Sequence, residues 1–129
     1  MNKAIEQILH FDNISSRELF ELFTDANKHA EITRGAKTSI SALEGSSFSL
    51  LNGNLKGKNL RIVPNRMIVQ SWRGNVWRDD DLDSILTLVF NDTPKGCKLH
   101  MVHAFTPDQF DERWEEVYWQ PIRKYLKNK

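Results

Sequence analysis

The segment from Ser84 to Asn91 reads SILTLVFN, and the segment from Cys97 to Phe105 reads CKLHMVHAF. Both follow the two-residue period of a half-buried β-strand. The predicted inward faces are Leu86, Leu88 and Phe90 on the first strand and Leu99, Met101, His103 and Phe105 on the second. The five residues between the segments include Pro94 and Gly96 and leave no room for a crossover helix. This stretch therefore predicts two neighbouring antiparallel strands.

Further strands are predicted on the N-terminal side of this pair. They are Ala4–Phe11, Lys37–Ala42, Ser47–Leu51, Asn54–Val63 and Met67–Arg73. Asn52-Gly53 separates two of them, and Asn-Gly is a strong hairpin signal because a tight hairpin turn needs positive φ angles. The links between consecutive strands from Lys37 onward are all short, so the sheet is predicted to be antiparallel.

Two short helices are predicted between the first strand and the rest of the sheet. Ser15 can cap the first helix, with Glu18 as the second half of a capping box. Asp25 can cap the second helix, which is expected to end near Thr33 because Gly35 follows.

A longer helix is predicted from Asp108 to about Lys127, where apolar residues recur at spacings of three and four. Pro121 has no backbone N–H and is expected to kink or locally widen this helix. The predicted fold class is α+β, a curved antiparallel sheet wrapped around a long C-terminal helix. Residues 1–129 are expected to form a single domain.

Composition excludes several classes of protein. The chain has 129 residues, with 18 Lys and Arg against 17 Asp and Glu, a balance that argues against a nucleic-acid partner. The single cysteine, Cys97, excludes an intramolecular disulfide and fits a reducing compartment. The longest apolar run, near Ser84–Phe90, is far shorter than the roughly 20 residues of a membrane span. The N-terminus carries charge where a signal peptide is apolar, so a cytoplasmic protein is expected.

Several motifs occur in a characteristic order. They are Leu55-Lys56-Gly57, Val63-Pro64, the strand Ile68–Arg73 ending in Trp-Arg, Trp77, the strand start Ser84–Leu88, and then Trp114 and Tyr118-Trp119. This order resembles the helix-grip fold of the START-like, or SRPBCC, superfamily. Within it, the chain is similar to the family homologous to the C-terminal domain of the activator of the heat-shock protein 90 ATPase. The Asn- and Trp-rich segment with which the eukaryotic activator stimulates the ATPase has no counterpart in these residues. The resemblance therefore implies the fold and a link to stress response, and leaves the activity open.

A strongly curved sheet leaves a gap wherever the helix does not fill the curve. Apolar cavities with a few polar groups are the usual small-molecule sites. The residues expected to line such a ligand-binding cavity are Trp72, Leu88, Met101, His103, Trp114 and Tyr118. The alternative is that these large side chains simply fill the core.

His103 stands on an otherwise apolar face. A neutral imidazole there can orient a ligand or act as a base, or it can be a core histidine bonded to a neighbour. The sequence identifies no orienting carboxylate and no nucleophile, so no catalytic residue is predicted. No cofactor or metal is predicted either, since His100 and His103 point to opposite faces of a strand. The acidic run Asp79–Asp83 is interpreted as a solvated loop that also borders the mouth of the pocket.

Three functions remain open from the sequence. The first is a non-catalytic module that binds a small hydrophobic molecule between sheet and helix. The second is an interaction domain for a chaperone or another protein, with Trp119 as a candidate interface residue or, equally, as a cover for the sheet edge. The third is a small enzyme that uses His103 in the cavity.

Overall fold

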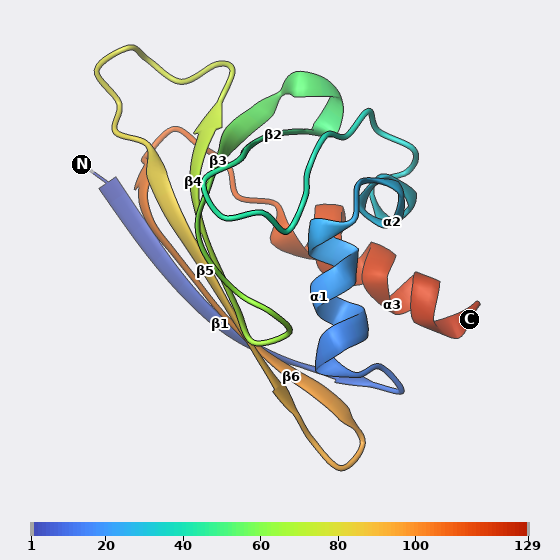
Figure 1. Ribbon diagram of the computed structural model, residues 1–129. Coiled ribbons are helices and arrows are strands. Elements are labelled where there is room, and N and C mark those ends of the chain that lie inside the picture. Colours follow the sequence, from blue (N-terminus) through green and yellow to red (C-terminus); the bar gives the residue numbers. More distant parts are fainter. Residues whose placement is uncertain (1, 129) are drawn as a thin grey trace.

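The computed structural model describes residues 2–128. Over these residues the chain forms a six-stranded antiparallel sheet in the order β1-β6-β5-β4-β3-β2. The strands are β1 (Asn2–Asp12), β2 (Ser47–Leu50), β3 (Leu55–Val63), β4 (Met67–Gly74), β5 (Ser84–Asp92) and β6 (Gly96–Pro107). The sheet curves, and the helices lie together on one of its faces (Figure 1). The predicted α+β helix-grip architecture is confirmed.

The two short helices follow the first strand as predicted. Helix α1 (Ser16–Thr24) begins after Ser15, whose side chain accepts from Glu18 N while the Glu18 carboxylate accepts from the Ser15 backbone. Helix α2 (Ala26–Ile32) begins after Asp25, whose carboxylate accepts from Lys28 N. The chain then turns through Gly35, which has a φ of +77°. Such an angle favours glycine because a Cβ would be strained there.

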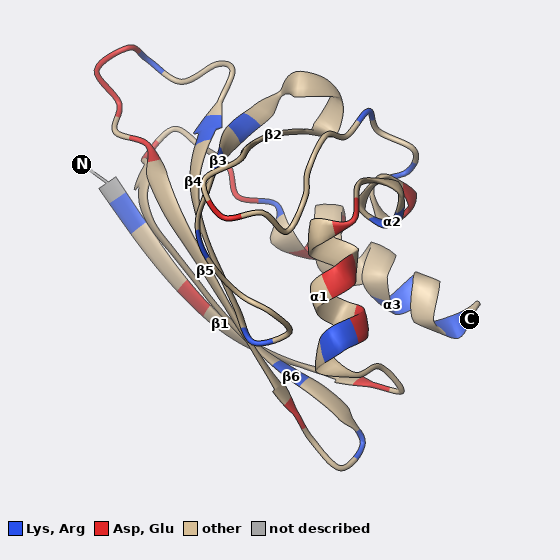
Figure 2. Cartoon of the chain, in the orientation of Figure 1, with Lys and Arg blue, Asp and Glu red and all other residues tan. Residues whose placement is uncertain are grey.

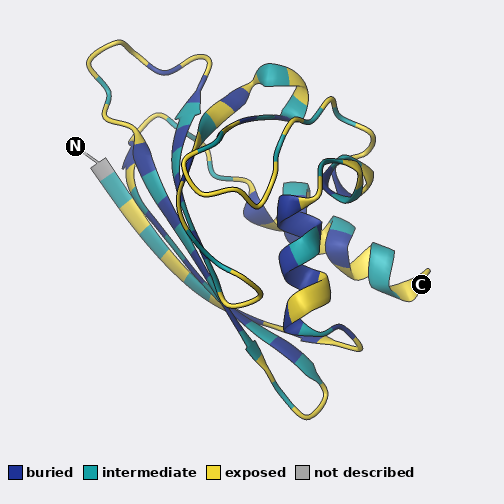
Figure 3. Cartoon of the chain, in the orientation of Figure 1, coloured by how far each residue is buried: buried dark blue, intermediate teal, exposed yellow. Residues whose placement is uncertain are grey.

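The core lies between the concave face of the sheet and the helices. Burial alternates along the strands, as Figure 3 shows. Leu86, Leu88 and Phe90 are buried on β5, and Leu99 and Met101 are buried beside them on β6. Both inward faces predicted from the two-residue period are thus confirmed up to His103.

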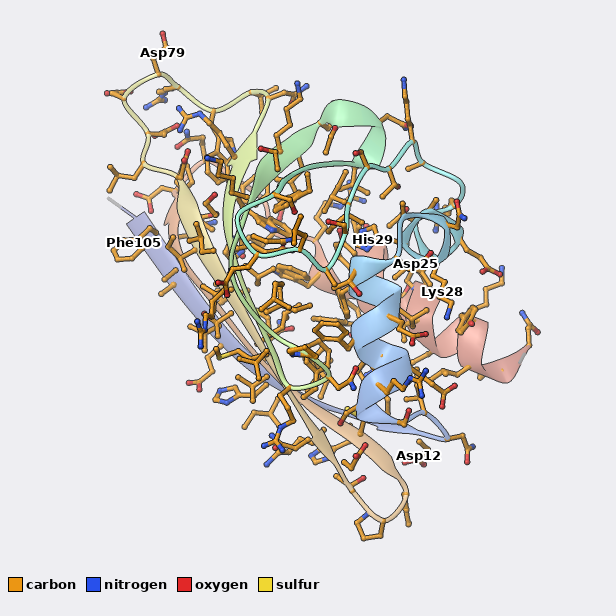
Figure 4. All side chains as sticks on the ribbon, in the orientation of Figure 1. Asp12, Asp25, Lys28, His29, Asp79 and Phe105 are labelled. Carbon is orange, nitrogen blue, oxygen red and sulfur yellow. The ribbon has the colours of Figure 1, made fainter. Side chains whose placement is uncertain are left out.

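Phe105 departs from the predicted face of β6. The register between β1 and β6 shifts by one residue at this point, since Lys3 pairs with Thr106 but Ala4 pairs with Ala104. Phe105 is the unpaired residue of this bulge, with a φ of +64°. A bulge turns the following side chains over, and Phe105 is half exposed on the outer side of the sheet (Figure 4).

The predicted strand Lys37–Ala42 is wrong. The segment makes a single bridge, in which Ser39 exchanges two backbone hydrogen bonds with Ser49. Its neighbouring backbone groups bond to side chains instead, for example Lys37 N to Asn52 Oδ1. Little of the segment is buried, so no packed face holds a strand register.

The C-terminal helix begins later than predicted. Residues 108–113 are not helical, and the helix consists of a π-helical turn, η2 (Glu115–Trp119), followed by α3 (Gln120–Lys127). The predicted effect of Pro121 is confirmed, because the wide π-turn directly precedes the proline that cannot donate a helical hydrogen bond. Among residues 2–128, no helix is long and apolar enough to span a membrane.

Candidate functional site

An apolar pocket of about 210 Å³ opens where the C-terminal helix meets the end of β4. A short 3-10 turn, η1 (Leu51–Gly53), and the non-helical segment before the helix complete its walls. The lining residues on the sheet side are Leu51, Asn54, Leu55, Trp72, Gly74, Asn75 and Val76. Those on the helix side are Phe110, Asp111, Glu112, Arg113, Trp114, Val117 and Tyr118.

The structure divides the six predicted ligand-binding residues into two groups. Trp72, Trp114 and Tyr118 line the pocket. Leu88, Met101 and His103 are almost completely buried in the core and do not contribute to its walls. The role of the six residues in ligand binding stays a prediction, with the first three in position to contact a ligand.

The aromatic wall of the pocket is braced by ring stacking. The Trp114 ring lies 5.2 Å from that of Trp72, at an interplanar angle of 27°, and 5.2 Å from that of Tyr118. On another side it stacks on Trp119 at 5.4 Å. Trp119 itself is buried and donates to Gln7 Oε1 on the edge strand β1. It therefore covers the sheet edge, and its expected role as an exposed interface residue is wrong.

A larger surface groove of about 630 Å³ lies between α2 and α3. Its walls include the charged side chains of Glu31, Arg34 and Lys124. Apolar walls with a few polar groups characterise small-molecule sites. The smaller pocket beside Trp72 and Trp114 is therefore the stronger candidate.

His103 connects two partners that the sequence reasoning missed. Its Nδ1 lies 2.6 Å from Glu112 Oε1, and its Nε2 lies 2.7 Å from Ser84 Oγ. All three side chains are buried. Glu112 was missed because it fell within a predicted helix, where it reads as a solvent-facing residue. Ser84 was noted only as the start of a strand.

The Glu112 carboxylate is held by several donors. Trp114 Nε1 donates to Oε1 at 3.1 Å, and Thr106 Oγ1 donates to Oε2 at 3.1 Å. Burial opposes ionisation of this carboxyl, but the hydrogen bonds from His103, Trp114 and Thr106 outweigh it and keep the pKa of Glu112 below its usual value. These contacts also explain why residues 108–113 leave the helical path.

The Ser84–His103–Glu112 arrangement has the order of a serine–histidine–acid triad. A nucleophile, however, must reach its substrate. Ser84 is 0% exposed, and its hydroxyl also lies 3.3 Å from the Trp72 carbonyl oxygen. The His103 ring packs at a steep angle against the rings of Trp72 and Trp114. The network therefore connects β5 and β6 to the segment before the C-terminal helix, and its contacts are those of residues that stabilise the fold.

Comparison with known proteins decides the family. The family model described as activator of Hsp90 ATPase homolog 1-like protein matches residues 13–127. The chain belongs to this family. The human activator of 90 kDa heat shock protein ATPase homolog 1 is 29% identical over 114 residues, which is 85% of this chain and 33% of the human protein. The corresponding homolog from Dictyostelium discoideum is 28% identical over 115 residues, 88% of this chain and 30% of that protein. The chain thus spans about a third of the length of these relatives.

Solved structures show the same fold for this member of the activator-homolog family. An HSP90 activator from Plasmodium falciparum superposes with a TM-score of 0.80 at 24% identity, covering 98% of this chain and 96% of that one. A protein from Cytophaga hutchinsonii superposes with a TM-score of 0.76 at 14% identity, covering 99% and 97%. At these identities the likeness concerns the fold alone.

A second buried histidine, His29, is hydrogen-bonded to the pocket-lining residue Tyr118. His29 Nδ1 lies 3.1 Å from the Leu22 carbonyl oxygen, which can only accept, so Nδ1 carries the proton. His29 Nε2 then accepts the hydrogen of the Tyr118 hydroxyl at 3.1 Å. Burial lowers the pKa of His29 to about 4 and raises that of Tyr118. In this activator-homolog domain a pocket-lining tyrosine is therefore oriented by a neutral histidine.

The stability of the domain is expected to fall as the pH is lowered from about 6.5 to 4. The unfolded chain binds a proton at His29 in this range and the folded chain does not, so stability is fully present above pH 6.5 and is lost below it. Each pH unit between the two pKa values costs about 1.4 kcal/mol, which gives a loss of about 3 kcal/mol near pH 4. Urea unfolding at a series of pH values measures this loss of stability.

His29→Gln is expected to flatten this dependence, because glutamine does not titrate. His10→Gln, at an exposed histidine of β1, is the matched control and should leave the dependence intact. The two variants are compared between pH 6.5 and 4.5, because the lowered pKa of Glu112 contributes to the dependence below about 4.5. An equally steep dependence in His29→Gln would contradict the assignment.

Proposed function

We propose that this chain is a non-catalytic module that binds a small hydrophobic molecule between its sheet and its C-terminal helix. The observation that carries the proposal is the 210 Å³ pocket with Trp72, Trp114 and Tyr118 in its wall. A cavity of about 150 Å³ in another protein is large enough to hold benzene. This pocket therefore has room for one substituted ring or a short branched chain. We also propose that residues 1–129 act as one cytoplasmic domain.

The surrounding contacts support binding without catalysis. The walls are held in place by stacked rings and by the hydrogen bonds of Tyr118 and Trp114. Preformed walls reduce the entropy that binding must overcome. The arrangement around His103 would offer the Ser84 hydroxyl as a nucleophile. Ser84 is buried and is not among the residues that line the pocket.

The first test is native mass spectrometry of freshly purified protein, followed by thermal unfolding with a library of small apolar compounds. A ligand is expected to raise the melting temperature in proportion to RT ln(1 + [L]/Kd). Val117→Phe places a larger side chain in the pocket wall and should weaken binding at least tenfold. Val89→Phe adds the same ring at a half-buried position on the outer face of β5 and should leave affinity unchanged. Absence of any bound mass and of any stabilising compound would refute the proposal.

The family assignment supports a second candidate function, interaction with an Hsp90-type chaperone. The human and Dictyostelium relatives are named as activators of the 90 kDa heat shock protein ATPase, and this chain matches about a third of each. Titration of the chain against an Hsp90-type chaperone, with ATPase rate and binding heat as separate readouts, tests this function. Binding without a small ligand, and unaffected by Val117→Phe, would favour the second candidate over the first.

A further inference from the structure

The mouth of the pocket is formed by two segments that are far apart in the sequence. The loop after β4 contributes Asn75 and Val76, and the segment before the C-terminal helix contributes Phe110 to Arg113. Gln109 Nε2 donates to Asp81 Oδ2 at 2.8 Å and joins the two segments. The Phe110 ring also packs edge-on against Trp77 at 5.1 Å. Charges on both segments therefore act on the same opening.

These two segments are predominantly acidic, and Figure 2 shows the acidic residues along the loop between β4 and β5. Their carboxylates are those of Asp79, Asp80, Asp81, Asp83, Asp108, Asp111 and Glu112. The nearby arginines are largely occupied. Arg73 bonds to Asp83 and to two backbone carbonyls, and Arg113 is paired with Glu116. Lys3 Nζ donates to the Phe110 carbonyl oxygen at 2.5 Å, and Arg78 is a further cation of the loop. The balance of charge at the mouth is negative.

Two carboxylates line the pocket itself, and they differ in availability. Glu112 already accepts from His103, Trp114 and Thr106. Asp111 is exposed and accepts no hydrogen bond from any residue in the range 2–128, with Arg113 as its electrostatic neighbour. Asp111 is thus the carboxylate at the pocket that can receive a hydrogen bond from a ligand.

The aromatic wall offers apolar contact area for the body of a ligand. The Trp114 ring is stacked on Trp72 and on Trp119, so the wall supplies contact area and the selectivity for charge comes from the mouth. Trp72, Trp114 and Tyr118 form the wall, and Asp111 lies at the mouth. The wall together with this carboxylate suits an apolar body that carries an ammonium group and disfavours a carboxylate or phosphate.

From this juxtaposition we propose that the pocket selects a small amphipathic amine, with its apolar body against the aromatic wall and its ammonium group beside Asp111. This inference rests on the proposed function and names the chemical class of its ligand. A ligand of this class has one ring or short chain and a positively charged nitrogen near the opening.

Three probes of similar shape test the inference by isothermal titration at pH 7: 2-phenylethylamine, 2-phenylethanol and phenylacetate. Their heads are cationic, neutral and anionic. The amine is expected to bind about tenfold more tightly than the alcohol, and phenylacetate more weakly than both. Raising the salt concentration from 20 to 300 mM is expected to reduce the preference for the amine several-fold, because salt screens exposed charges.

Asp111→Asn is expected to bring the amine to the affinity of the alcohol while leaving the alcohol unchanged. Asp79→Asn removes the same charge at the tip of the loop, where the side chain points away from the molecule (Figure 4), and should keep most of the preference. Because Asp111 is exposed, the variant is expected to fold, which its urea unfolding curve checks.

The outcomes separate this inference from the proposed function. Equal affinities for the three probes, or a preference for phenylacetate, would overturn the inference and leave the binding module intact. No binding of any probe would count against both. A preference for the amine that persists in Asp111→Asn would overturn the assignment of the ammonium site to Asp111.

Discussion

His103→Ala is expected to lower the free energy of unfolding by about 3–5 kcal/mol, the usual cost of leaving a buried charge, here the Glu112 carboxylate, without its partner. The substitution takes the donor at Nδ1 from Glu112 and the partner at Nε2 from Ser84. The Glu112 carboxylate then stays buried with fewer donors, and a cavity opens beside Trp72 and Trp114. A histidine that served only catalysis would leave stability nearly unchanged.

Urea unfolding of wild type and variant measures this difference. His10→Ala, at an exposed position, is the matched control and should change stability by less than about 0.5 kcal/mol. Glu112→Gln keeps the shape of the side chain, and its effect should be less than additive with that of His103→Ala, because both remove the same interaction. A loss below about 1 kcal/mol in His103→Ala would show that the network does not brace the fold.

Trp119→Ala is expected to cost about 3–5 kcal/mol, as for other large buried aromatic side chains cut back to alanine. Trp119 is 1% exposed, stacks on Trp114 and donates to Gln7. The loss removes support from the aromatic wall of the pocket as well as from the edge of the sheet.

Equilibrium unfolding again provides the measurement, with Trp119→Phe as a graded variant that keeps a ring but loses the hydrogen bond. Val76→Ser is the surface control, because Val76 is 81% exposed. If Trp119→Ala were as stable as wild type but failed to bind a protein partner, Trp119 would be an interface residue and its burial in the structure would be contradicted.

The sequence predicts what local periodicity and capping determine. The two-residue period placed Leu86, Leu88 and Phe90 on the buried face of β5, and the pair Ser15 and Glu18 located the start of α1. The order of motifs led to the family, which the match over residues 13–127 confirms. These features depend on residues close together in the chain.

The errors occur where distant contacts decide the conformation. Glu112 turns inward to reach Thr106 and His103 on β6, and this ends the helical path that apolar spacing had extended back to Asp108. The bulge at Phe105 depends on the partner strand β1. Trp119 lies in the π-turn, where the period differs from that of an α-helix, so helical spacing misplaced it.

Only part of the candidate site could be predicted, again because contacts between distant residues decide the rest. Trp72, Trp114 and Tyr118 were identified because large aromatic side chains stood on inward faces, and the structure brings them together at the pocket. Which inward residues reach a cavity and which fill the core depends on rotamers and on the course of residues 108–113. That is why Leu88 and Met101 could not be separated from the other three.

The pairing of β1 with β6 determines the order in which the chain can complete its fold. β1 is the first strand of the described fold and its partner β6 is the last, with Asn2 opposite Pro107. Contacts between residues this distant in sequence form slowly, since a long loop must close before they stabilise anything. β1 can therefore pair only once β6 is available, whereas β2 to β5 each pair with a strand that is adjacent in sequence. Docking of β1 onto β6 joins the first and last strands of the fold and is expected to be a late step of folding.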